Sequence, residues 1–128
     1  MCKSVQINGS PYYDGGIADS IPVRKALEDG CDQLIVVLTQ SEGFRKKSLK
    51  HPALVKLLYQ EYPNLTKSLL NRHENYNESL GIVNMLEQQH KAIVLRPPAH
   101  INVTRTERNP QKLNTLAHAG YEIAMQML

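Results

Sequence analysis

Two short apolar runs, separated by a long stretch with helical periodicity, constrain the fold of this 128-residue chain more than any other feature. The first run, Leu34 to Leu38, is rich in β-branched residues and bounded by loop residues, which is typical of a strand buried on both faces. The second, Ala92 to Leu95, is also strand-sized and is followed by Pro97 and Pro98. Strands that alternate with helical segments predict an α/β fold, a sheet with helices packed on its faces.

The N-terminal segment predicts a β-hairpin over residues 5–13. Val5 and Ile7 alternate with a polar residue, and Asn8-Gly9, the strongest short hairpin signal, follows them. The chain then returns as a second strand that ends at Tyr13, with one of its two tyrosines facing the core. The hairpin therefore delivers Asp14 at the end of a strand.

Proline and glycine mark the expected helix ends. A helix begins near Pro22 and stops at Gly30. After a loop over residues 40–50, apolar spacings of four predict helix from Pro52 to His90, with one helix beginning at Pro63 and a separate one at about Asn77. The last helix begins at Asn109-Pro110, an N-cap residue followed by a first-turn proline. Its apolar stripe comprises Leu113, Leu116, Ala117, Gly120, Ala124 and Met127. No repeat or linker divides the chain, so residues 1–128 are predicted to form a single domain.

Composition narrows the class of protein. The formal net charge is only +3, and no nucleic-acid-binding motif is present, so nucleic acid is not an expected partner. No apolar run approaches the roughly 20 residues of a transmembrane helix, and no secretory signal follows Met1. Cys2 and Cys31 are expected to be reduced thiols of a cytoplasmic protein. The scattered histidines, His51, His73, His90, His100 and His118, lack metal-ligand spacing, so neither a metal nor a cofactor is predicted.

The segment Asp14-Gly15-Gly16 has two interpretations. Aspartate followed by glycine is a common turn pair, in which the carboxylate accepts a hydrogen bond from a nearby backbone N–H. Alternatively, a carboxylate at a strand end is placed for chemistry, because sites in α/β folds lie at strand ends. Two glycines after it permit positive φ and the close approach of a backbone or a ligand.

Residues 8–40, NGSPYYDGGIADSIPVRKALEDGCDQLIVVLTQ, resemble the DG[GA] segment of bacterial patatin-like phospholipases. GFRKK at 43–47, AIVLRP at 92–97 and NPQKLNTLAHAGYEIAM at 109–125 are similar to the C-terminal half of the same proteins. The resemblance implies a three-layer α/β/α sandwich and hydrolysis of lipid or other carboxylic esters by a serine–aspartate dyad. It also implies that Asp14 is the dyad aspartate, with Gly15 and Gly16 completing its motif.

The chain departs from that family where the nucleophile is expected. It has no G-x-S-x-G segment, and only thirteen residues precede Asp14. The nearest match, Asn77-Glu78-Ser79-Leu80-Gly81, falls inside a predicted helix, whereas a nucleophile elbow follows a strand. We therefore expect the C-terminal portion of a patatin-type sandwich, without the N-terminal strands and the elbow, that is inactive alone. The alternative is a non-catalytic α/β domain that self-associates or binds a partner through an uncovered sheet edge.

Three further features carry expectations. Arg45, Lys46 and Lys47 form the densest basic cluster, which is either a patch for anionic phospholipid head groups in peripheral membrane contact or a solvated loop. Asp19 either orients the loop after the glycines or accepts hydrogen bonds from backbone N–H groups ahead of the next helix. Arg96 follows a buried strand and is expected at the rim of the sheet, paired with a carboxylate.

Overall fold

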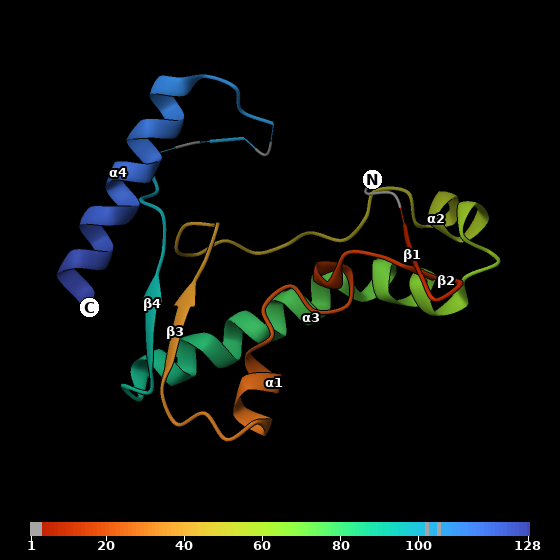
Figure 1. Ribbon diagram of the computed structural model, residues 1–128, viewed down its shortest axis with the longest axis horizontal. Helices are drawn as coiled ribbons and strands as arrows, with labels where there is room; N and C mark the ends of the chain where they lie inside the picture. Colours follow the sequence, from red (N-terminus) through yellow and green to blue (C-terminus); the bar gives the residue numbers. More distant parts are fainter. Residues whose placement is uncertain (1–3, 102, 105) are drawn as a thin grey trace. The chain divides into compact units, whose positions relative to one another are not determined.

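The computed structural model describes residues 4–101, 103–104 and 106–128 and shows a mixed helix-and-sheet fold, which confirms the α/β class (Figure 1). In chain order the elements are β1 Val5–Ile7, β2 Ser10–Tyr12, the 3-10 turn η1 Gly15–Ile17, α1 Val23–Glu28, β3 Leu34–Val37, α2 Pro52–Leu58, α3 Pro63–Gln88, β4 Ala92–Leu95 and α4 Pro110–Met127. Within the described part of the chain, no helix is both long and apolar enough to cross a membrane.

The chain divides into two compact units, each built from two separate stretches of sequence. Unit 1 comprises the described residues of 1–25 and 45–82, and unit 2 comprises 26–44 with the described residues of 83–128. The expectation of one domain over 1–128 stays a prediction.

Unit 1 opens with the predicted hairpin. β1 and β2 pair antiparallel, with Val5 opposite Tyr12 and Ile7 opposite Ser10. Asn8 and Gly9 both have positive φ, 50° and 77°, as a two-residue hairpin turn requires. The second strand ends at Tyr12, one residue earlier than predicted, and Tyr12 is exposed. Tyr13 is the half-buried tyrosine of the pair, and its ring meets that of Tyr62 edge-on at 6.5 Å.

Helix α3 corrects the prediction of two helices between residues 63 and 90, because it runs unbroken from Pro63 to Gln88. Asn77, the predicted start of a new helix, instead lies in the middle of α3, where its side chain bonds the backbone of Lys46 at 2.9 and 3.0 Å. Because the side-chain amide bonds Lys46, it does not compete for the backbone hydrogen bonds of its own helix, as asparagine side chains otherwise do. Ser79 lies inside the helix, as predicted, is buried and accepts a hydrogen bond from Arg24 at 3.3 Å.

Unit 2 contains a two-stranded parallel sheet in which Leu34 lies opposite Ala92 and Val37 opposite Leu95. The expectation that the first strand is buried on both faces is wrong, because Ile35 and Val37 are 61% and 71% exposed. The physical reason is the two-residue period of a strand. Only one face of the sheet is covered in unit 2, so every second apolar residue faces outward.

Arg96 lies just beyond β4 and confirms the predicted carboxylate pair. Its two terminal nitrogens each bond one oxygen of Glu87 at 2.7 Å, and one of them also donates to Asn84 at 3.0 Å. The hydrogen bonds to Glu87 are the main cause that raises the pKa of Arg96. This planar two-point contact fixes the end of β4 to the last turns of α3.

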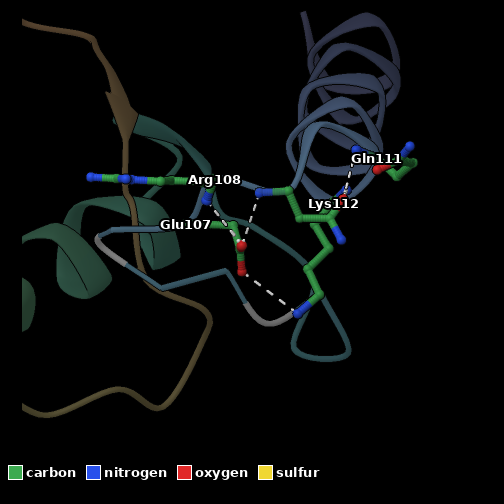
Figure 2. A network of polar contacts seen from close by, with 5 residues as sticks. Glu107, Arg108, Gln111 and Lys112 are labelled. Atoms are coloured by element: carbon green, nitrogen blue, oxygen red, sulfur yellow. Dashed lines mark hydrogen bonds and ion pairs between the residues drawn. The ribbon is translucent and has the colours of Figure 1, made fainter.

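Helix α4 begins at Pro110, as predicted, in a network of polar contacts (Figure 2). The side chain of Asn109 accepts hydrogen bonds from the backbone N–H groups of Gln111 and Lys112 at 3.0 and 3.4 Å. Glu107 accepts from the N–H groups of Asn109 and Arg108, which lowers the pKa of its carboxyl group. Its second oxygen lies 3.6 Å from the ammonium group of Lys112. The start of α4 is thus fixed by local contacts.

The apolar stripe of α4 is only partly covered. Leu116 and Ala124 are half-buried, while the remaining stripe residues, Leu113, Ala117, Gly120 and Met127, are exposed. Within α4 no residue is fully buried. The position of α4 is therefore set by the local contacts at its start rather than by deep burial. The contribution of these contacts to stability can be measured.

Replacing the N-cap by Asn109→Ala should lower the free energy of unfolding by about 1 kcal/mol, because two backbone N–H groups lose their acceptor. Urea denaturation followed by circular dichroism measures the change. Asn114→Ala is the matched control, since Asn114 is exposed within the same helix and alanine is the better helix former. Equal destabilisation by the two variants would show that the cap contributes nothing specific.

Candidate functional site

Asp14 lies two residues beyond the end of β2 and caps the short turn η1. Its Oδ1 accepts a hydrogen bond from the N–H of Gly16 at 2.8 Å, and its backbone oxygen accepts from Ile17 at 3.0 Å. The side chain is exposed. The carboxylate therefore makes the local capping contact of an Asp-Gly turn and at the same time faces solvent at a strand end. The contact to the Gly16 N–H is the one that the turn interpretation predicts, and a chemical role for Asp14 stays a prediction.

The two glycines of the motif have different surroundings, and neither uses positive φ, unlike Gly9, Gly30 and Gly43. A Cβ atom on Gly16 would lie 3.2 Å from Oδ1 of Asp14, which is closer than most real contacts of this kind. A Cβ atom on Gly15 would meet no atom of the described chain within 4 Å. The close approach of the Asp14 carboxylate explains why residue 16 is a glycine, whereas Gly15 borders open space.

The carbonyl oxygen of Gly16 is the point at which the turn is anchored. It accepts a hydrogen bond from Nε of Arg72 at 2.9 Å and another from the hydroxyl of Ser20 at 2.6 Å. Arg72 lies on α3, 56 residues away along the chain, and is half-buried. Sequence reasoning missed both donors. No local pattern links a helix arginine to a carbonyl group so distant in sequence, and Ser20, although only four residues from Gly16, was not singled out as a donor.

Asp19 accepts a backbone hydrogen bond ahead of the next helix, which is the second of the two roles considered from the sequence. Its Oδ1 accepts a hydrogen bond from the N–H of Ile21 at 3.1 Å, immediately ahead of α1. The bond resembles that of Asp14 to Gly16 in type and length. Asp19 is therefore a chemically similar carboxylate in the same loop, and a useful control for Asp14.

The turn can supply a carboxylate but, within the described part of the chain, no nucleophile. Oδ1 of Asp14 is occupied by the Gly16 N–H, and no serine hydroxyl of the described residues donates to either oxygen. An exposed carboxylate on a fixed turn can accept a proton from a hydroxyl group brought to it. The arrangement suits a base that works on a group supplied from elsewhere.

The basic cluster also lies in unit 1 and is held by α3. Asn77 bonds both the N–H and the carbonyl of Lys46, so one side chain fixes the backbone of this loop. The ammonium group of Lys46 lies 4.5 Å from the centre of the Tyr76 ring, whose burial raises the pKa of its hydroxyl. Arg45 and Lys47, on either side, are exposed. The cluster is thus presented on an anchored loop.

Unit 2 carries an apolar groove of about 350 Å³ at the carboxyl ends of its parallel strands. It is lined by residues of β3, β4, α4 and the segments that follow the strands: Val37, Leu38, Thr39, Leu95, Arg96, Pro97, Leu116, Gly120 and Ile123. The guanidinium group of Arg96 is already paired with Glu87, so the groove offers little uncompensated charge. It is an apolar surface rather than a site with its own chemistry.

Cysteine and histidine form no cluster in the part of the chain that is described. Cys31 is a free, exposed thiol, and Cys2 lies outside the described residues. Among the described residues, no three His, Cys, Asp or Glu side chains come together as metal ligands would.

The fold and these sites define a mixed α/β protein with an anchored carboxylate turn. Residues 62–128 match the family described as a domain of unknown function (DUF6363), and the chain belongs to that family. The matched span contains α3, β4 and α4 but not Asp14 or the basic cluster. Comparisons with curated proteins and with solved structures returned no match.

If Arg72 anchors the turn, Arg72→Ala should loosen it. The loss of one hydrogen bond from a charged donor, on the order of 1 kcal/mol at a half-buried site, should speed amide exchange at Ile17 and Ala18 about fivefold. Hydrogen–deuterium exchange followed by NMR measures this. Lys67→Ala removes an exposed cation from the same helix and should leave these amides unchanged. An Arg72→Ala variant with unchanged exchange would contradict the anchoring role.

Proposed function

We propose that this chain supplies the aspartate of a patatin-like serine acyl hydrolase that acts on lipid or other carboxylic esters. The observation that carries the proposal is the exposed carboxylate of Asp14, fixed at a strand end by a turn that Arg72 and Ser20 anchor. The similarity of residues 8–40 to the DG[GA] segment of that family supports the same role. The proposal includes the patatin-type three-layer sandwich, of which this chain forms the C-terminal portion.

In the proposed reaction Asp14 is a general base. It takes the proton of a serine hydroxyl as the serine oxygen bonds the ester carbonyl carbon, and the protonated carboxyl group then gives this proton to the departing alkoxide. Water attacks the resulting acyl-enzyme in the same way, with Asp14 taking its proton and returning it to the serine oxygen. Fixing the carboxylate in advance reduces the entropy lost when the serine hydroxyl meets it.

The serine of this reaction is not supplied by the 128 residues, which contain no G-x-S-x-G segment. The chain alone is therefore expected to lack ester hydrolysis above background. The decisive material is a longer polypeptide that includes whatever is encoded in frame upstream of Met1. The proposal requires that this upstream segment carry a G-x-S-x-G sequence.

In that longer polypeptide, Asp14→Asn should reduce hydrolysis of a short-chain p-nitrophenyl ester about 10²- to 10⁴-fold, the usual contribution of a general base. Asn keeps the oxygen that accepts from Gly16, so the turn itself should survive. Asp19→Asn, the same chemical change five residues further on, should leave the rate within a few-fold of wild type, roughly the effect of a surface substitution. Unchanged turnover in Asp14→Asn would sink the proposal, as would an upstream frame that lacks the serine.

A second candidate function, self-association, is favoured by a separate observation in unit 2. One face of the two-stranded sheet exposes Ile35 and Val37, and each strand has an unpaired edge in the described part of the chain. Parallel sheets are normally covered on both faces, whereas this face is apolar and exposed. A second copy of the chain is the occupant we propose, because a two-fold axis can bring together the unpaired edges and the exposed apolar faces of two copies.

If the chain self-associates in this way, light scattering on the purified chain should give a mass near twice the 14.5 kDa of one chain. Val37→Lys places a charge on the exposed face, which opposes burial against a second copy, and should shift the mass to that of one chain. Val5→Lys is the matched control, since Val5 is similarly exposed on β1 of unit 1. A monomeric wild-type chain would exclude self-association. If both variants were monomeric, the exposed face of the sheet would not be the cause of the association.

A further inference from the structure

We infer that residues 45–58, here named the basic segment, form a docking surface for an anionic phospholipid bilayer. The segment contains five basic residues, Arg45, Lys46, Lys47, Lys50 and Lys56, and no carboxylate. The rest of the chain has ten basic and twelve acidic residues, so the net positive charge of the protein is concentrated here.

These charges are directed to solvent. Arg45, Lys47, Lys50 and Lys56 are exposed and, among the described residues, take part in no ion pair. Lys46 has a different role, because its ammonium group lies over the ring of Tyr76 and its backbone is bonded by Asn77. One basic residue therefore fixes the loop to α3, and its neighbours remain available to an anionic surface.

The second observation is an exposed leucine face in the same segment. Leu54, Leu57 and Leu58 stand at the spacing i, i+3, i+4 on α2, which places them on one face of the helix. They are 52%, 66% and 63% exposed, and Leu49 in the preceding loop is exposed as well. Val55, which is half-buried, turns toward the protein instead. The apolar face thus points to solvent beside the basic residues.

This combination favours a membrane over a nucleic acid. Lysine and arginine beside exposed leucines characterise helices that lie in the interface of a bilayer, where the leucines enter the acyl boundary and the cations meet the head groups. α2 has only seven residues, so its leucines alone bind weakly and the cations are needed. A nucleic acid would use the charges but would leave the leucines in water. The inference does not depend on the hydrolase proposal, because binding needs neither Asp14 nor a serine.

The test measures binding of the 128-residue chain to vesicles by co-sedimentation. We expect binding to vesicles of equal parts phosphatidylcholine and phosphatidylglycerol, weakening at high salt, and little binding to phosphatidylcholine alone. Lys47→Glu/Lys50→Glu should weaken the binding about tenfold or more. Lys67→Glu/Lys91→Glu makes the same change in net charge at exposed positions outside the segment and should have a much smaller effect.

Leu57→Ser tests the apolar half of the surface and should weaken vesicle binding roughly fivefold. Leu128→Ser is its control, because Leu128 is 67% exposed and lies outside the segment. The proposal is overturned by a wild-type chain that ignores anionic vesicles, by equal binding to neutral vesicles, or by equal losses in the control variants. Comparable affinity for a DNA duplex, with no effect of Leu57→Ser, would assign the segment to nucleic acid and also overturn it.

Discussion

Hydrogen bonds from polar side chains of α3 to loop backbones are the interactions on which unit 1 depends. Arg72 bonds the carbonyl of Gly16, and Asn77 bonds both backbone groups of Lys46. Loop backbone outside a helix or sheet must find other partners for its N–H and C=O groups, and here a long helix supplies them. The carboxylate turn and the basic loop are therefore both held by one element, although 31 and 56 residues separate the partners.

Local chemistry allowed much of the fold to be predicted. The turn at Asn8-Gly9 needs positive φ at both residues, and both have it. Asn109 and Pro110 similarly fix the start of α4, because an N-cap acts on N–H groups two and three residues away. The same local signal failed at Asn77, whose amide bonds a distant loop rather than its own helix. A sequence pattern shows that a cap is available but not whether a tertiary partner takes it.

Burial and long-range anchors could not be predicted in the same way. Leu34 to Val37 has the composition of a strand covered on both faces, yet Ile35 and Val37 face solvent. The composition of a strand shows that its residues suit a buried face, but whether that face is covered depends on which other elements pack against it. For the candidate site, the position of Asp14 at a strand end was predictable from the hairpin. The donors Arg72 and Ser20 were not predictable, because a sequence does not show which side chain will donate to the backbone carbonyl of a glycine.

The family match and the candidate sites occupy different parts of the chain, and α3 connects them. Residues 62–128 include the anchors Arg72 and Asn77, whereas Asp14 and the basic segment precede the matched span. The family region therefore supplies the support, and the preceding residues supply the groups that we propose to act on ester and membrane. It follows that the side chains at 72 and 77 matter for these activities only where the preceding loops are present. A chain with the matched span alone would keep the helix but have nothing for these two side chains to hold.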